Sequence, residues 1–178
     1  MLQQQFKQKI KKELWQKLSK NNINTVPVLK KVVINYRLPS AKESKELLIN
    51  AETELMAISG QKARLCRAKK SEANFKLRQG DPLALKVTLR GRRMFDFVEK
   101  LFNLVLPRLR DFRGLSSNSF DDGANYNLVI KDQTYFPEIN LDKVKKIRSV
   151  QISLVTSTSS KSDAKMLLSA LGLPFKKE

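Results

Sequence analysis

Histidine is absent from the 178-residue sequence, and this absence removes several kinds of chemistry. The chain has no histidine general base, no histidine metal ligand and no catalytic triad of the usual serine type. Cysteine occurs once, as Cys66, so the chain can form no internal disulfide and no cysteine-based zinc site. We interpret Cys66 as a small residue that fills a strand position. We expect the chain to work in the reducing compartment where it is made.

Long apolar runs and acidic residues are also scarce. No apolar segment approaches the roughly 18 to 20 residues that a membrane span needs, so we expect no membrane partner. Lysines at positions 7, 9, 11, 12 and 17 interrupt the N-terminal segment, which is therefore not a secretory signal. The chain has 17 acidic residues and 35 Lys and Arg residues, which gives a net charge of +18 and a pI near 10.2. This range is typical of nucleic-acid binders.

Half of the excess charge lies in one stretch, residues 62–93. It contains eleven Lys and Arg residues and two acids, and therefore has a net charge of +9. Cations so close together repel each other, and a polyanion would relieve that repulsion and release its own counterions on binding. The charge pattern therefore indicates a nucleic-acid ligand.

The first segment has the spacing of an amphipathic helix over residues 1–21. Apolar residues recur every four positions, with Lys and Gln between them: Leu2, Phe6, Ile10, Leu14 and Leu18. Trp15 widens the apolar stripe. We expect this helix to pack on its own domain, and a basic membrane-surface helix is the alternative.

The remaining pattern predicts an α+β fold in a single domain, residues 1–178. We expect strands over 28–36, 64–68, 83–90, 125–131 and 148–157. Helices are expected from Ser40 to a glycine cap at Gly60, from Met94 to Leu106 as a buried helix, and from a cap at Ser160 to Leu171. The inner face of the first of these is formed by Leu47, Leu48, Ala51, Leu55 and Ile58. A basic loop is predicted over 69–81. The central order of strands and helices is that of a split β-α-β core, as in ferredoxin-like and RRM-like domains. It predicts an antiparallel sheet with helices packed on one face and the other face free.

The predicted strand over residues 83–90 alternates between two kinds of side chain. Leucine and valine at positions 83, 85, 87 and 89 point one way, and Lys86, Thr88 and Arg90 point the other. A solvated sheet face would also show polar residues. Because so many cations lie nearby in the sequence, we favour a face that binds RNA.

The basic loop surrounds one aromatic residue, Phe75, with cations at Lys69, Lys70, Lys76 and Arg78. Long cationic side chains can follow phosphates, and an exposed phenylalanine can stack on a base. Phe75 could equally pack down onto the core, and the sequence leaves both alternatives open.

In a chain without histidine, acidic residues are the first candidates for catalysis, and two groups of them have a suitable spacing. Asp111, Asp121 and Asp122 would have to hold a metal ion for nuclease chemistry, which is the alternative function. The Asp121–Gly123 tripeptide is more simply explained as a turn. Asp96 and Glu99 have the spacing of helix-surface acids that pair with Arg92, Arg93 or Lys100. The sequence contains no Walker loop and no dinucleotide fingerprint, and we predict no active site and no cofactor.

Several ordered segments carry a resemblance to a known family. They are Ile58–Lys62, Phe75–Gly80, Lys86–Arg90, Pro107–Leu115, Phe136–Ile139 and the terminal Leu171–Phe175. Together they resemble the bacterial-type large-subunit ribosomal protein five, the universal 5S-rRNA-binding ribosomal protein family.

The resemblance implies a structural, non-enzymatic role in the ribosome. Members help to attach 5S rRNA to the central protuberance of the large subunit. They also contact 23S-type rRNA, the elbow of the peptidyl-site tRNA, the small-subunit head through one of its proteins, and other central-protuberance proteins. Carried onto matching positions, the 5S contact falls on Asn35, Ser59, Gln61, Lys62, Thr88 and Arg90. The loop near the tRNA corresponds to residues 69–79, with Lys69, Lys70, Phe75, Lys76 and Arg78, and additional basic contacts are expected at Lys11, Lys12, Arg92 and Arg93.

The sequence departs from the family pattern at three glycine-containing sites. The glycine stretch that follows the asparagine of the first strand is replaced by Tyr36–Pro39, an Ala-Gly pair by Ala73–Asn74, and a loop arginine is missing from Asp122–Tyr126. Glycines allow backbone conformations that other residues avoid, so loop detail and the tRNA and bridge contacts are affected most. The bias to Lys, Asn and Ser fits an A/T-rich genome. A bacterial cytoplasm or an organelle would both fit, and the composition favours an organelle.

Overall fold

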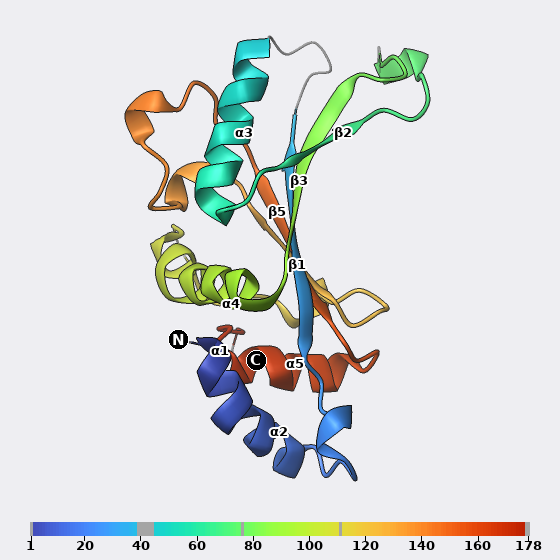
Figure 1. Ribbon diagram of the computed structural model, residues 1–178, viewed down its shortest axis with the longest axis vertical. Coiled ribbons are helices and arrows are strands. Elements are labelled where there is room, and N and C mark those ends of the chain that lie inside the picture. Colours follow the sequence, from blue (N-terminus) through green and yellow to red (C-terminus); the bar gives the residue numbers. More distant parts are fainter. Residues whose placement is uncertain (1, 39–44, 76, 111, 177–178) are drawn as a thin grey trace. The chain divides into compact units, whose positions relative to one another are not determined.

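The computed structural model describes residues 2–38, 45–75, 77–110 and 112–176, and it has an α+β fold (Figure 1). Five strands form one antiparallel sheet in the order β2-β3-β1-β5-β4. The strands are β1 (Leu29–Arg37), β2 (Arg64–Arg67), β3 (Pro82–Leu89), β4 (Tyr126–Ile130) and β5 (Val150–Thr156). The predicted fold class, an antiparallel sheet combined with helices, is confirmed.

The sheet order refines the predicted split β-α-β core. The strands β2, β3 and β1 are neighbours, as in that arrangement. The place on the other side of β1 is taken by β5, however, and β4 lies beyond it at the edge. The sequence gives the order of elements along the chain but not which of two late strands pairs with β1, because that choice depends on contacts between residues far apart.

The chain divides into two compact units. The first contains residues 1–32, 90–128 and 153–178, and the second contains residues 33–89 and 129–152. The strands β1, β4 and β5 each contain residues of both units. The two units are described separately below.

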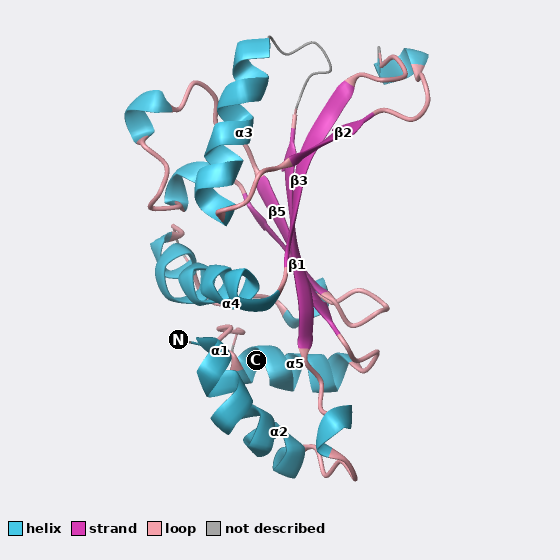
Figure 2. Cartoon of the chain, in the orientation of Figure 1, coloured by secondary structure: helices cyan, strands magenta, loops and turns pink. Residues whose placement is uncertain are grey.

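The first unit is mainly helical (Figure 2). The predicted N-terminal helix runs from Leu2 to Lys17, as α1 (Leu2–Gln5), a π-helical turn (Phe6–Ile10) and α2 (Lys11–Lys17). The unit also contains α4 (Gly91–Lys100), which continues as a π-helical turn (Leu101–Val105), and α5 (Lys161–Ala170). None of the helices in the described ranges is long and apolar enough to cross a membrane.

The apolar face of the N-terminal helix packs inside the first unit. Helix α1 contacts α4, and α2 contacts α5. The Phe6 ring lies 5.6 Å from the Phe95 ring, and Leu14 is buried. The Glu99 carboxylate accepts a hydrogen bond from the Leu2 backbone N–H at 3.2 Å. The predicted docking of this helix on its own domain is confirmed, and the membrane-surface alternative loses the free apolar face that it requires.

Helix α4 begins three residues before the predicted start at Met94. Its first turn, Gly91 to Arg93, is exposed and contains no large apolar residue, so the apolar spacing could not mark the start of the helix. The following face is buried as predicted, with Met94, Phe95, Phe97 and Val98 at 7% exposure or less. Asp96 pairs with Arg92 at 3.7 Å, as predicted for surface charges at helical spacing.

The C-terminal segment closes the first unit. The predicted helix cap is confirmed, since the Ser160 hydroxyl accepts a hydrogen bond from the Asp163 N–H. The backbone of Leu115 then pairs with the last described residues: its N–H donates to Pro174 and its carbonyl accepts from Lys176. The ring of Phe175 lies 6.1 Å from that of Phe120 and 5.7 Å from that of Tyr126.

The second unit places helix α3 (Lys45–Ser59) on one side of the β2–β3 hairpin (Figure 1). Helix α3 contacts β3, and Ala51, Leu55 and Ile58 are buried as predicted. Leu47 and Leu48, also predicted to face inward, are half-buried. The predicted helix start, Ser40, lies outside the described residues.

Candidate nucleic-acid interface

The strand β3 separates a core face from an open face. Leu85, Val87 and Leu89 are each 2% exposed or less, whereas Lys86 is exposed and Thr88 is half-buried. This confirms the predicted alternation, except that Leu83, expected to be in the core, is 37% exposed. Leu83 lies at the beginning of the strand, where the hairpin leaves the core (Figure 1). The open face therefore carries side chains with hydrogen-bonding and cationic groups.

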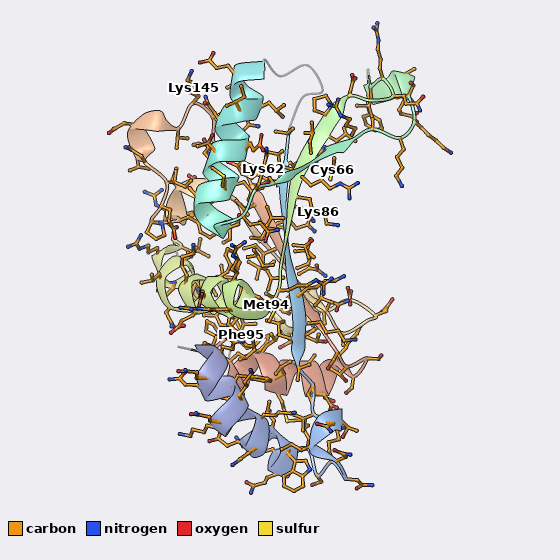
Figure 3. All side chains as sticks on the ribbon, in the orientation of Figure 1. Lys62, Cys66, Lys86, Met94, Phe95 and Lys145 are labelled. Carbon is orange, nitrogen blue, oxygen red and sulfur yellow. The ribbon has the colours of Figure 1, made fainter. Side chains whose placement is uncertain are left out.

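The pairing of β2 with β3 adds a second row to this face. In the antiparallel register Arg64 lies opposite Lys86, and Cys66 lies opposite Ala84. Residues opposite each other in a sheet share one face. Cys66 is a free thiol in a strand position, as predicted. Figure 3 shows the side chains of Cys66 and Lys86 on the side of the hairpin that faces away from α3.

The turn after α3 brings Gln61 to the same strand. Gly60 ends the helix with φ at +66°, as predicted for a C-terminal cap, and its N–H donates to the Met56 carbonyl. The Gln61 amide nitrogen then lies 3.5 Å from the Thr88 carbonyl oxygen. Lys62 follows and is exposed. Gln61 and Thr88, 27 positions apart in the sequence, are thus neighbours in the fold.

Ser59 has a different role in this turn. Its side chain is 7% exposed, and its hydroxyl lies 2.7 Å from the Leu55 carbonyl oxygen and 3.0 Å from that of Gln61. These contacts tie the last turn of α3 to the segment that carries Gln61. The geometry makes Ser59 a positioning residue for its neighbours, and a direct RNA contact by Ser59 stays a prediction.

Asn35 lies on β1, the strand next to β3 in the sheet order. It is half-buried, whereas Ile34 and Tyr36 on either side are fully buried. Asn35 therefore points away from the core, as Thr88 does. The predicted 5S-contacting residues of the second unit are thus Asn35, Gln61, Lys62 and Thr88 on or beside the open face, with Ser59 beneath the turn.

Tyr36 fixes β1 to the elements behind it. Its hydroxyl donates a hydrogen bond to the Glu54 carboxylate of α3 at 2.5 Å, and the Arg148 guanidinium lies 6.0 Å from its ring centroid. Burial, followed by the hydrogen bond to Glu54, raises the pKa of the Tyr36 phenol well above its usual range. The phenol is therefore neutral at physiological pH and acts as a donor. Tyr36 thus anchors β1 to α3.

The predicted basic loop, residues 69–81, lies between β2 and β3 as expected, and backbone pairs at two places extend the hairpin into it. Ala68 and Asp81 are joined through their backbones, and so are Glu72 and Leu77. The Asp81 carboxylate also accepts a hydrogen bond from the Arg78 N–H. These pairings define a basic arm, residues 68–81, at the end of β2 and β3 (Figure 1).

The basic arm presents its predicted contact residues to solvent. Phe75 is 80% exposed, so it does not pack onto the core, and that alternative is wrong. Lys69, Lys70 and Arg78 are exposed as well. Lys76 lies outside the described residues. An exposed ring with cations around it has the composition of a site that stacks on a base and contacts phosphates.

The remaining predicted contacts belong to the first unit. Arg90 directly follows β3 with an extended backbone and precedes helix α4, and its side chain is exposed. Arg92 and Arg93 lie in the exposed first turn of α4. Lys12 is exposed and Lys11 half-buried on α2. These cations are accessible, and their contact with RNA stays a prediction.

The acidic residues of the nuclease alternative do not form a metal site in the part of the chain that the structure describes. Asp121 and Asn125 close a turn, as predicted: the Asp121 carboxylate accepts from the Asn125 N–H at 2.8 Å. Although burial acts to raise the pKa of Asp121, hydrogen bonds from Asn125 outweigh it and the pKa is lowered. Asp122 is fully exposed and lies 3.4 Å from the Lys161 amine. Asp111 lies outside the described residues, and no group of three possible metal ligands occurs within them.

Sequence reasoning missed Arg64 and Lys86 as a pair. Both were included in the basic stretch, but their direct opposition follows only from the strand register. The sum of their positions is constant along an antiparallel hairpin. Between Cys66 and Arg67, however, the register of β2 on β3 shifts by one residue, so extrapolation from the turn alone would have paired Arg64 with Leu85.

Comparisons with known proteins identify the family. Residues 22–78 match the family model of Ribosomal protein L5, and residues 82–175 match the family model of the C-terminus of the same family. The large ribosomal subunit protein uL5 of Thermus aquaticus is 49% identical over 99% of this chain and 97% of the relative. That of Caldanaerobacter subterraneus is 47% identical over 99% and 98%, and that of Buchnera aphidicola is 46% identical over 97% and 96%. The chain therefore belongs to the uL5 family of large-subunit ribosomal proteins, which are structural and non-enzymatic components of the ribosome.

Proposed function

We propose that this chain binds 5S rRNA and helps to attach it to the central protuberance of the large ribosomal subunit. The open face of the second unit carries the proposal: Asn35, Gln61, Lys62 and Thr88 present amide, ammonium and hydroxyl groups on or beside one β-surface. Arg90, an exposed cation of the first unit, is proposed as a further contact. Such a surface can hydrogen-bond to base edges and sugars while its cations contact phosphates.

The other contacts are assigned by exposure and charge. The basic arm, with Phe75 at its end, suits the elbow of a peptidyl-site tRNA, because an exposed ring can stack on nucleotide bases. Lys11, Lys12, Arg92 and Arg93 are available to 23S-type rRNA. Contacts with the small-subunit head and with other central-protuberance proteins are part of the same proposal.

The composition also supports a proposal about the compartment. The chain has no histidine and is rich in Lys, Asn and Ser, as expected of an A/T-rich genome such as that of an organelle. We propose that the protein works in organellar ribosomes, and the ribosomes of a bacterial cytoplasm are the alternative. Fractionation of cells tests this, since recovery only with cytoplasmic ribosomes would refute an organellar location.

A competition experiment tests 5S binding. Labelled 5S rRNA is bound to the purified protein, and unlabelled 5S rRNA or an unrelated structured RNA of equal length is added. We expect 5S rRNA to compete at least tenfold better. Binding should weaken with salt, with a log–log slope of roughly −0.7 to −0.9 per phosphate contact. Equal competition by the two RNAs would contradict the proposal.

Two matched variants locate the interface. Thr88→Val removes one hydroxyl from the open face with little change of shape, and we expect it to reduce the preference for 5S rRNA. Thr53→Val alters an exposed hydroxyl on α3 that donates to the Ile49 carbonyl, away from the open face, and should leave RNA binding unchanged. Equal binding by both variants would show that the hydroxyl of Thr88 makes no contact with the RNA.

A further inference from the structure

Two cations face each other across the β2–β3 hairpin in the absence of any ligand. Arg64 is paired with Lys86 in the antiparallel register, and both side chains are exposed. Side chains opposite each other in this way have β-carbons about 4.5 to 5.5 Å apart, and like charges at such positions destabilise the sheet. The pair therefore weakens the free protein.

Nothing in the described part of the chain neutralises this pair. Neither β2 nor β3 contains an acidic residue. Neither the Arg64 nor the Lys86 side chain has an ion-pair or hydrogen-bond partner among the described residues. Other cations are satisfied within the protein, such as Lys20 by Asp163 at 2.9 Å and Arg67 by the Gly80 carbonyl at 2.9 Å.

We propose that Arg64 and Lys86 form a clamp for one phosphate group of the RNA backbone, and that the bound phosphate removes the repulsion that their opposition creates. An anionic oxygen between two facing cations is attracted by both, and the arginine fork can hold it through two N–H groups. The proposal rests on the proposed RNA-binding function of the open face. It adds that the two facing cations lower the stability of the free protein, and that bound RNA restores this stability.

A rival explanation of the two cations comes from their position in the sheet. The strand β2 is at the edge. Charged side chains on edge strands prevent unwanted pairing with other chains. If this were their only role, neutralising them would promote self-association and leave the affinity for RNA unchanged.

Four variants separate these possibilities: Arg64→Gln, Lys86→Gln, the double variant, and Lys131→Gln as control. Lys131 is an exposed lysine of the same unit, directly after β4.

The first measurement is the thermal unfolding midpoint of the free protein. At 50 mM NaCl we expect each single variant to raise it by about 1 to 3 °C. Removing either charge already ends the repulsion, so the double variant should gain no more than a single one. At 1 M NaCl, where screening acts within about 3 Å, the gain should disappear.

The second measurement is the affinity for 5S rRNA over a range of salt concentrations. We expect each single variant to bind roughly five- to tenfold more weakly at 0.1 M salt, and to lower the magnitude of the log–log salt slope by about 0.7 to 0.9. Lys131→Gln should change neither the midpoint nor the affinity. Variants that are less stable than the parent, or that bind RNA as the parent does, would overturn the clamp. Unchanged RNA affinity with increased self-association would identify edge protection instead.

The unmodified protein serves to separate the two proposals. If it binds 5S rRNA and an unrelated RNA equally, the proposed function fails. The clamp still stands in that case, provided that the variants gain stability and lose affinity for both RNAs. If the unmodified protein prefers 5S rRNA but the variants behave like Lys131→Gln, the clamp fails and the proposed function stands.

Discussion

At the scale of single residues, Gly114 shows how little space the fold leaves at one backbone position. A β-carbon added there would lie 2.8 Å from the Lys176 backbone nitrogen and 2.9 Å from the Phe175 carbonyl carbon. Its φ of +95° is also unfavourable for any residue with a side chain. The close approach allows Leu115 to pair with the C-terminal segment, so glycine is required for the closure of the first unit.

Gly114→Ala should therefore lower the free energy of unfolding by about 3 to 5 kcal/mol, as the sum of backbone strain and the steric contact. Gly172→Ala is the matched control, because Gly172 has a similar φ of +99° but nothing within 4 Å of an added β-carbon. It should cost only the strain, about 1 to 2 kcal/mol. Urea unfolding followed by circular dichroism measures both, and equal losses would show that the contact with the C-terminal segment is not tight.

At the scale of elements, the N-terminal helix combines two functions on two faces. Its apolar face packs on α4 and α5, with Phe6 against Phe95. Its opposite face carries exposed lysines, including Lys12. The helix thus contributes to the core of the first unit and holds its cations in fixed positions, where RNA can reach them.

The substitution Phe6→Ala tests whether this helix is part of the folded core. Phe6 is 6% exposed, so its truncation should cost about 3 kcal/mol, through lost burial and the cavity that remains. Gln8→Ala, on the exposed side of the same helix, should change stability by less than about 0.5 kcal/mol. A similar result for both variants in thermal or urea unfolding would mean that the helix does not pack on its unit.

The elements themselves were largely predictable, because local periodicity is enough to identify a helix or strand. Helix α3 lies within its predicted range, and its Gly60 cap and the Ser160 cap of α5 were found from sequence alone. The basic arm was predicted as a loop, but its backbone pairs were not, because they are accompanied by contacts between Ser71 and Gln79 and between Asp81 and Arg78 that no short pattern encodes. The insertion of β5 beside β1 was likewise invisible, since it is decided by tertiary contacts.

The candidate site was predictable in its composition but not in its geometry. Alternation along β3 placed Lys86 and Thr88 on one face, and this holds. The turn geometry at Ser59 depends on how α3 ends, and the opposition of Arg64 to Lys86 depends on the strand register. Both are set by contacts between atoms, which the sequence pattern does not show. Residue types therefore indicated the ligand class, and the structure shows which residues act together.

At the scale of the whole molecule, the net charge of +18 acts against the compact state of the free protein. Acids neutralise some cations locally, as in the pair of Lys145 with Glu46. Within the described ranges, no acid pairs with Arg64 or Lys86 on the open face. A polyanion or salt should therefore stabilise the fold as a whole.

We expect the thermal unfolding midpoint to rise by several degrees between 20 mM and about 0.3 M NaCl, and then to level off as screening saturates. Sucrose, which carries no charge, serves as the control and should raise the midpoint steadily with concentration instead. Differential scanning calorimetry distinguishes the two curves. A midpoint that falls with added NaCl would show that attractive pairs dominate over self-repulsion.

The assembly of the first unit from three separated stretches of chain has a consequence for its synthesis. Helix α2 packs on α5, which is translated more than 140 residues later, whereas every residue of the second unit precedes α5. At roughly 5 to 20 residues per second, the apolar stripe of α2 waits about 7 to 30 s for its partner. During that delay the nascent helix has only its lysines to keep it from aggregating, so chaperone capture is most useful to the earliest part of the polypeptide.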